Sequence, residues 1–174
     1  MPIQTTVNFK HDPLLQGMVA HARPGEDLTS YADVDIEFGL GLVYDDEENN
    51  GRLKVKVPDA SGGLFVGVSV FDHTRPVTGE VPDQATLITT QNAKYKAGDP
   101  IRRRTKGPIQ VWVEQAVTPA SPVFLRHTAN GPGSVPGQFR ADADTANADD
   151  VSNFCRFAAT TNGPSLVTLE LNLP

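Results

Sequence analysis

The stretch Tyr95–Thr128, YKAGDPIRRRTKGPIQVWVEQAVTPASPVFLRHT, decides the predicted fold. Two segments that end in proline, Ala97–Pro100 and Pro119–Pro122, each stand directly before a strand-like run. Proline lacks an amide hydrogen, so the first residue of a strand is a place where it sacrifices no hydrogen bond. Between these segments, Ile109–Ala116 alternates apolar and polar residues, which is typical of a half-buried strand. We therefore predict a β-meander of three strands with short connections, at Ile101–Thr105, Ile109–Ala116 and Val123–Thr128.

The same alternation occurs on both sides of this stretch. Further strands are predicted over Val34–Tyr44, Leu53–Val57 and Leu64–Phe71, and a terminal hairpin over Phe154–Thr160 and Leu166–Leu173. Gly39 and Gly41 lie inside the first of these runs, where glycine marks a bend or a close approach of another backbone. The 15 glycines and 14 prolines supply frequent turns. The sequence predicts an all-β fold, a single β-sandwich or barrel-like domain.

The first 33 residues differ from the rest of the chain. Pro13, Gly17 and Pro24 interrupt every periodic run in this region. One interpretation is a loop-rich lead-in, and the other is an extended arm that becomes ordered by lying on a partner. We therefore expect an N-terminal arm over residues 1–33 and a β domain over residues 34–174.

Composition excludes several classes of protein. The formal net charge of −6 argues against a nucleic-acid partner, because such proteins carry a basic face. No apolar run approaches the roughly 18 residues of a membrane span, so no membrane partner is expected. Met1–Thr5 has no basic region followed by an apolar stretch, which predicts no signal peptide. The single cysteine, Cys155, forms no internal disulfide and is expected to be a small buried apolar residue.

No group of residues has the spacing of an active site, so the sequence predicts a protein that is not an enzyme and binds no cofactor or metal. The four histidines, His11, His21, His73 and His127, have no metal-ligand spacing. The acidic run Asp45–Glu48 is interpreted as a solvated hairpin tip. The run at 141–150 lacks the glycine and the terminal glutamate of a calcium loop.

Two features are candidate interface residues. Trp112 lies on the polar side of its strand, and tryptophan is enriched among the residues that anchor interfaces. It contacts either a partner or another segment of its own chain. The second feature is the one basic cluster of the sequence, which is either a solvated strand edge or a docking patch for an acidic partner. It consists of Arg102, Arg103, Arg104 and Lys106.

The order of several short segments resembles a known family, the structural cement or head-decoration proteins of tailed bacteriophages. The segments that carry this resemblance are Gln4–Thr5, Phe65–Val68, Ala97–Ile101, Gly107–Val113, Ser121–Arg126, Gly137–Arg140, Phe154–Ala159 and Val167–Leu173. The resemblance covers most of residues 38–173. The acidic residues at 45–51 and the Ala/Asp-rich residues at 141–150 have no counterpart in the family pattern.

The resemblance implies a non-enzymatic virion protein, made in the cytoplasm of a bacterial host and bound to the outer capsid surface. Its expected partners are the major capsid protein and further copies of itself. A homotrimer is expected first and a dimer second, because closed symmetry matches the symmetry axes of a shell. The modest apolar content, 39%, also suggests that surface is buried between copies. The alternative is a β-sandwich that binds carbohydrate or a host surface, although one Trp and three Tyr are few for that function.

Overall fold

The computed structural model describes residues 15–19, 24–45, 53–72 and 94–174. These ranges contain strands and one short 3₁₀ turn but no α-helix, which confirms the predicted all-β fold. The elements are β1 (Glu26–Ala32), β2 (Ile36–Glu37), β3 (Gly41–Tyr44), β4 (Lys54–Lys56), β5 (Phe65–Ser69), β6 (Lys94–Tyr95), β7 (Pro100–Val113), β8 (Phe124–Arg126), β9 (Phe139–Arg140), η1 (Asp144–Ala146), β10 (Ala148–Asp150), β11 (Cys155–Phe157) and β12 (Ser165–Asn172).

Five strands close into a barrel. β1 pairs with β4, β4 with β3, β3 with β5 and β5 with β7, and β7 then pairs with β1 to complete the ring. Only the first part of β7, Pro100–Lys106, takes part in the pairing with β1. A closed ring leaves no unpaired edge among its members. One apolar cluster fills the barrel and includes Leu42, Val55 and Ile101, each fully buried.

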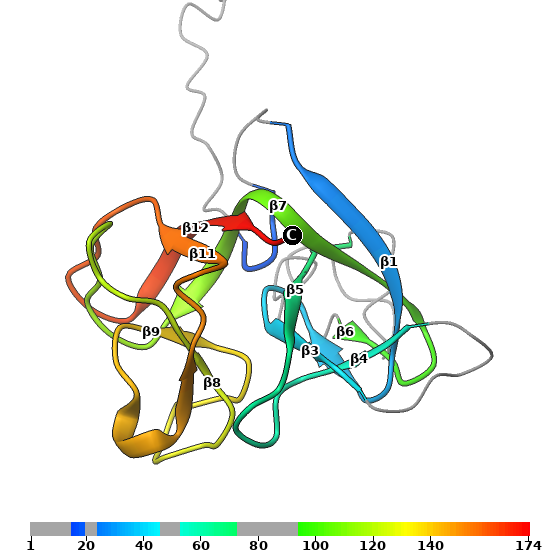
Figure 1. The fold of residues 1–174 in the computed structure, drawn as a ribbon, viewed down its shortest axis with the longest axis horizontal. Helices are drawn as coiled ribbons and strands as arrows, with labels where there is room; N and C mark the ends of the chain where they lie inside the picture. The colour runs from blue at the N-terminus through cyan, green and yellow to red at the C-terminus, as the bar shows by residue number, and fades with distance from the viewer. Residues whose placement is uncertain (1–14, 20–23, 46–52, 73–93) are drawn as a thin grey trace, which may run out of the picture.

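On the other side of β7 lie β8, β9, β10, β11 and β12, whereas β2 and β6 form a separate two-stranded sheet on the barrel side (Figure 1). The residues of β7 that follow the barrel pair antiparallel with β12, and Val113 pairs parallel with Phe139 of β9. β9 continues through β8 to β10, while β12 pairs with β11. A second apolar cluster, larger than the first, lies here and includes Ile109, Phe139 and Leu169. β7 is therefore shared by two packed regions.

The predicted meander is wrong because two of its strands are one. Ile101–Thr105 and Ile109–Ala116 fall within, or largely within, the continuous strand β7, and β8 pairs with β9 and β10 instead of β7. The backbone of Gln110 bonds to Gly17 and Met18, so even-numbered residues here direct their amides away from β12. The backbone nitrogen of Pro108 therefore faces away from β12. Its missing amide hydrogen costs no hydrogen bond to β12, and the strand continues through Pro108.

The predicted strand Val34–Tyr44 is divided into β2 and β3. Gly39 has φ +71°, a left-handed conformation that interrupts the strand. A Cβ atom at Gly39 would lie 2.5 Å from the backbone nitrogen of Gly17, so this glycine both bends the chain and admits another backbone. The two functions expected of a glycine in this run are both confirmed.

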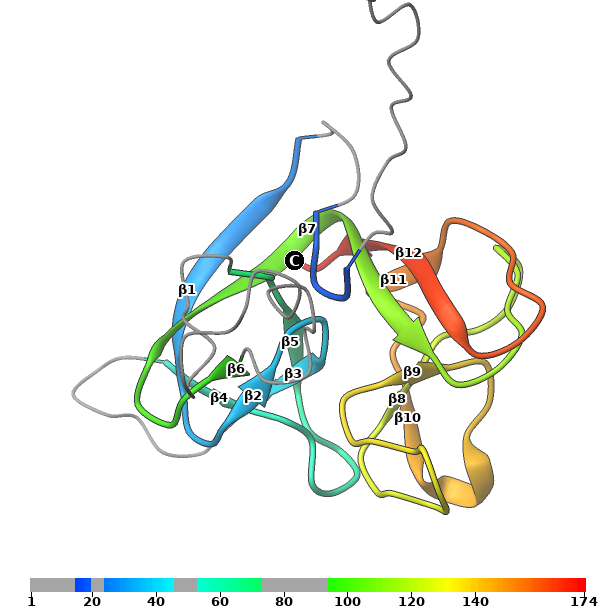
Figure 2. The same ribbon diagram turned by 180° about the vertical axis from the view of Figure 1, so that it is seen from behind.

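Part of the expected arm belongs to the barrel. β1 falls within residues 1–33, and Ser30 and Ala32 are buried. Segment 15–19 also contacts the core, because Gly17 donates to the carbonyl of Gln110 (2.7 Å) and accepts from the amide of Phe71 (2.8 Å). Figure 2 shows this segment in blue beside β7. Residues 1–14 lie outside the described residues, and an arm is still a prediction for them.

Three other predictions are confirmed. Both faces of β5 are buried, as the bulky residues on both of its sides indicated. β11 and β12 form the terminal hairpin, with Val167, Leu169 and Leu171 inside. Cys155 is buried, and burial raises the pKa of its thiol to about 12.

Gly67 provides a test of the barrel. It has φ +135°, and a Cβ atom there would lie 2.4 Å from the carbonyl oxygen of Arg104 on the neighbouring strand. Gly67→Ala should reduce the free energy of unfolding by more than the about 1–2 kcal/mol of left-handed strain alone. Gly62→Ala is the control, because Gly62 has φ +84° but no atom near the added methyl group. Equal losses in urea unfolding would contradict the close approach of β5 to β7.

Candidate binding surface

The structure separates the four residues of the basic cluster. Arg103 lies on the inner face of the barrel, where its Nε donates to the Ser30 hydroxyl (2.8 Å) and its Nη1 donates to the Val66 carbonyl. Arg104 is also buried, and its Nε donates to the carbonyl of Lys106 (3.0 Å). Burial lowers the pKa of both guanidinium groups. Arg103 thus connects β1 to β5, and Arg104 connects β7 to β1, because its Nη1 lies 3.6 Å from the Asp27 carboxylate.

Arg102 and Lys106 remain at the surface. The side chain of Arg102 is 58% exposed and pairs with Asp27, and the Lys106 ammonium lies 3.4 Å from the Glu26 carboxylate. Both acids belong to β1, so these pairs link the outer side of β1 to β7. An interface role for the cluster is still a prediction, and the burial of Arg103 and Arg104 leaves the other two residues as its exposed members.

Trp112 is half-buried on β7, between Val111 and Val113, which are fully buried. Alternation therefore places it on the outer face. Its partner across the sheet is Leu166 of β12, which is also half-buried. On the same face, Gln110 donates to the Thr168 hydroxyl (2.7 Å). The structure thus places a Trp–Leu pair on the outer face of the β7–β12 sheet, and its role as an anchor is still a prediction.

A buried ionic network lies at the end of β7, and the sequence analysis did not find it. Arg126 is 1% exposed, and its Nε and Nη2 donate to the two carboxylate oxygens of Glu114 (2.5 and 2.7 Å). Arg140 Nη1 donates to the same carboxylate (2.9 Å). Glu114 and Arg126 each follow a mostly apolar run, and Arg140 follows Phe139, so in the sequence all three look like ordinary residues at the ends of strands. Only the pairing of β8 and β9 beside the end of β7 brings them together.

This network fixes the Ala/Asp-rich residues at 141–150. Asp144 accepts from Arg126 Nη2 (2.7 Å) and lies 3.1 Å from Arg140 Nη1. Asp144, Thr145 and Ala146 all have positive φ, which non-glycine residues rarely adopt. The hydrogen bond from Arg126 lowers the pKa of Asp144. The acidic run is therefore a structural turn held by two buried arginines.

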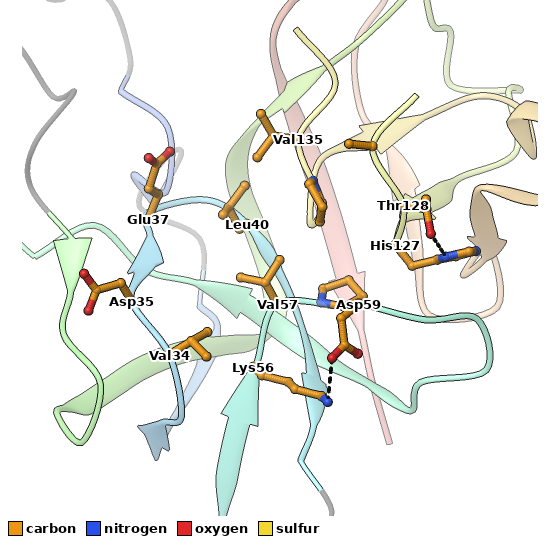
Figure 3. A pocket seen from close by; sticks show the side chains of 13 residues that line it. Val34, Asp35, Glu37, Leu40, Lys56, Val57, Asp59, His127, Thr128 and Val135 are labelled. Carbon is orange, nitrogen blue, oxygen red and sulfur yellow. Dashed lines mark hydrogen bonds and ion pairs between the residues drawn. The ribbon is translucent and has the colours of Figure 1, made fainter. Parts of the chain in front are cut away.

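A groove of about 560 Å³ runs between the barrel and the loop at residues 127–137 (Figure 3). Leu40 and Val57 lie between Val34 and Val135, which belong to opposite walls. Gly137 joins the walls at the base, where its carbonyl accepts from the Gly41 amide (2.8 Å). The volume is within the range of ligand and peptide sites, roughly 300–1,000 Å³.

The rim of the groove carries more carboxylates than cations. Asp35, Glu37 and Asp59 line it together with one ammonium group, that of Lys56, which donates to Asp59 (3.0 Å). Asp35 accepts from Lys96 (3.0 Å) and lies 2.8 Å from the Lys94 ammonium group. These two lysines lower the pKa of Asp35.

No group of three or more metal-ligating side chains converges among the described residues. His127 is described and buried, and its Nδ1 shares a hydrogen bond with the Thr128 hydroxyl (2.9 Å). The other three histidines, and residues 46–48 of the acidic run, lie outside the described ranges. No helix in those ranges has the length and apolar character needed to cross a bilayer.

A known protein family shares the sequence pattern of almost the whole chain. The family model described as "Structural cement protein (E217 gp24/Pam3 gp6)" matches residues 3–172. The chain belongs to this family of phage structural cement proteins. The matched residues include both the closed barrel and the C-terminal strands, so the family model covers all the described strands.

One solved structure has the same fold. A chain in the capsid of Myoviridae phage XM1 matches this cement protein with a TM-score of 0.63 and 17% identity, covering 99% of this chain and 98% of that chain. The N base of head fibre gp8.5 of bacteriophage phi29 matches with a TM-score of 0.42 and 12% identity, over 84% of this chain and 93% of that one. The search of curated proteins found no match.

The ionic network of the cement protein makes a stability prediction. Arg126→Met leaves the Glu114 carboxylate, whose side chain is only 11% exposed, with a single arginine, and removing one member of a buried ion pair typically costs about 3–5 kcal/mol. Arg102→Met is the matched control, since an exposed pair contributes about 1 kcal/mol or less. Urea unfolding followed by Trp112 fluorescence measures both variants. Equal losses would contradict the structural role of the network.

The network also predicts a pH dependence. The pKa of Asp144 is lowered from 3.8 in the folded protein, so its charge stabilises the fold above about pH 4. This contribution is lost as the pH falls through the lowered pKa. Asp144→Asn should therefore be less stable than the parent at pH 7, and the difference should shrink steadily below pH 4.

Glu37→Gln is the control for this pH series. The Glu37 carboxylate is exposed, and the residue that faces it across the β2–β6 pair is Lys94, with which it interacts through solvent. Because an exposed pair contributes about 1 kcal/mol or less, the replacement of Glu37 should change the unfolding free energy only slightly at both ends of the series. A difference between Asp144→Asn and the parent that is independent of pH would show that the Asp144 charge is not what holds the turn.

Proposed function

We propose that this cement protein binds the outer surface of a phage capsid and links neighbouring major capsid subunits. The observation that carries the proposal is the family match, which extends over nearly the whole chain. The fold shared with a chain of the XM1 capsid supports it. The protein acts by binding alone, and its partners are the major capsid protein and further copies of itself.

The physical task explains why many weak contacts suffice. Packaged DNA pushes outward on a shell and tends to open the seams between its subunits. A protein that touches both sides of a seam must release one side before the seam opens, and its remaining contact keeps the released side close enough to rebind, so its contacts reinforce one another. A shell covered with many copies gains resistance without a high affinity at any single contact.

A homotrimer is the proposed assembly, with a dimer as the second choice. Closed symmetry allows each copy to make the same contacts around a symmetry axis of the shell. The outer face of the β7–β12 sheet supports the proposal, because Trp112 and Leu166 form an apolar pair there that remains half-exposed. Arg102 and Lys106 are the members of the basic cluster that reach the surface.

The test uses capsids that lack their cement protein. The purified protein should bind them, and cryo-electron microscopy should show it outside the shell at the seams between subunits. Trp112→Ala should reduce occupancy or shift the oligomer, measured by light scattering, to smaller species. If Trp112 is an anchor, the affinity of the variant for the capsid should fall tenfold or more, since an anchor residue contributes about 2 kcal/mol or more.

Trp112→Phe is the matched control, because it keeps an aromatic ring at the same position. Thermal unfolding separates binding from folding in both variants. Lost occupancy at an unchanged melting temperature supports the interface role, whereas a large drop in melting temperature assigns Trp112 to packing within the chain. A failure of the parent protein to bind any capsid surface would overturn the proposed function itself.

A further inference from the structure

One buried arginine of the barrel has no carboxylate to balance its charge. Arg103 is 6% exposed, and its Nε and Nη1 donate to neutral acceptors, the Ser30 hydroxyl and the Val66 carbonyl. It makes no ion pair with a described carboxylate. Burial lowers the pKa of its guanidinium group, and electrostatic interactions with Tyr44 and Glu26 offset this only in part. A buried cation normally has an anionic partner, because its removal from water is costly.

The inner face of the barrel is open to solvent beside this guanidinium. Its third nitrogen, Nη2, has no hydrogen bond with a described residue and is not shielded from solvent. Leu28 is paired with Arg103 across β1 and β7, so both side chains lie on the same face. Leu28 is 41% exposed, whereas Ser30 and Ala32, further along that face of β1, are buried. A group from outside the chain can therefore approach Arg103 past Leu28.

A second exposed leucine directly precedes β5. Leu64 is 58% exposed, and alternation places it on the same face as Val66, whose carbonyl accepts from Arg103. Leu28 and Leu64 are two of the four large apolar side chains that are strongly exposed among the described residues. Exposed apolar groups around an unbalanced cation suit a partner that supplies both an anion and apolar side chains.

The neighbouring charges do not supply the missing anion. Arg102 and Arg104 share the Asp27 carboxylate, at the surface and below it. Lys106 pairs with Glu26. With the buried guanidinium, the paired strands β1 and β7 thus hold four cations beside two carboxylates, although the whole chain has a formal net charge of −6. A local excess of positive charge steers an acidic partner to this place.

We propose that the end of the barrel at Arg103 binds an aspartate or glutamate side chain of a major capsid subunit. The carboxylate accepts from Nη2 of Arg103, and Leu28 and Leu64 cover the apolar side chains that flank it. This inference rests on the proposed function, for which it names the chemistry of the capsid contact. The proposed contact between copies lies elsewhere, on the outer face of the β7–β12 sheet.

A carboxylate built into the site tests it first in the free protein. Cβ atoms of directly paired residues lie about 4.5–5.5 Å apart, so the new side chain of Leu28→Glu reaches the Arg103 guanidinium. Leu28→Gln is the matched control, because it has the same shape without the charge. Leu28→Glu should melt about 2–4 °C above Leu28→Gln, the shift expected for one added ion pair in a chain of this size. Equal melting temperatures would show that the guanidinium is not available to a carboxylate, which overturns the proposal.

Capsids that lack their cement protein provide the second test. Leu28→Glu should bind them tenfold or more weakly than Leu28→Gln, because its own carboxylate occupies Arg103 and repels that of the capsid. Thr29→Glu controls for charge alone, since Thr29 is exposed on the opposite face of β1. Its loss of affinity should be clearly smaller, and an equal loss in both glutamate variants would overturn the proposal.

The remaining outcomes separate this inference from the proposed function. If the parent binds capsids and Leu28→Glu binds them as well as Leu28→Gln does, the inference fails and the proposed function stands. A parent that binds no capsid overturns both. If Leu28→Glu changes the oligomeric state in light scattering but not the affinity for capsids, the site belongs to a second copy of this chain, and the proposal is wrong.

Discussion

The structure depends on one strand that belongs to two packed regions. β7 contributes its first residues to the closed barrel and its remaining residues to the sheet with β12 and β9. Gly107, with φ +92°, lies where the strand passes from one region to the other. A Cβ there would lie 3.0 Å from the Pro24 carbonyl oxygen, so the crossing brings the start of β1 against β7. Neither region can shift without disturbing the other.

Buried arginines hold the places where apolar packing is interrupted. Arg103 connects β1 to β5 inside the barrel, and Arg104 fills the space beside Gly25 and Gly107 at the crossing. Arg126 of β8 and Arg140 of β9 both donate to Glu114, directly after the end of β7. A guanidinium group has several donors in a fixed plane, so one side chain satisfies acceptors from different elements. These positions explain how a chain with few apolar residues still forms two ordered cores.

The sequence predicted features that depend on local pattern and missed those that depend on contacts across the fold. Alternation identified β5 and β12 correctly, and glycine chemistry identified the bend at Gly39. The division of β7 into two strands was wrong because a Lys-Gly-Pro motif is typical of a turn. Whether Pro108 needs an amide hydrogen depends on which segments lie beside it, namely β12 and the segment around Gly17, and the sequence does not reveal these neighbours. The groove and the ionic network unite residues far apart in sequence, which no periodicity reveals.

The order of the barrel strands along the chain has a consequence for synthesis. Every member of the ring, including the part of β7 that closes it, precedes residue 107, and the strands of the second region follow. On a ribosome the barrel can therefore close while the C-terminal strands are still being made. The second half of β7 then presents a formed edge onto which β12, which follows all the other described strands in the chain, can dock.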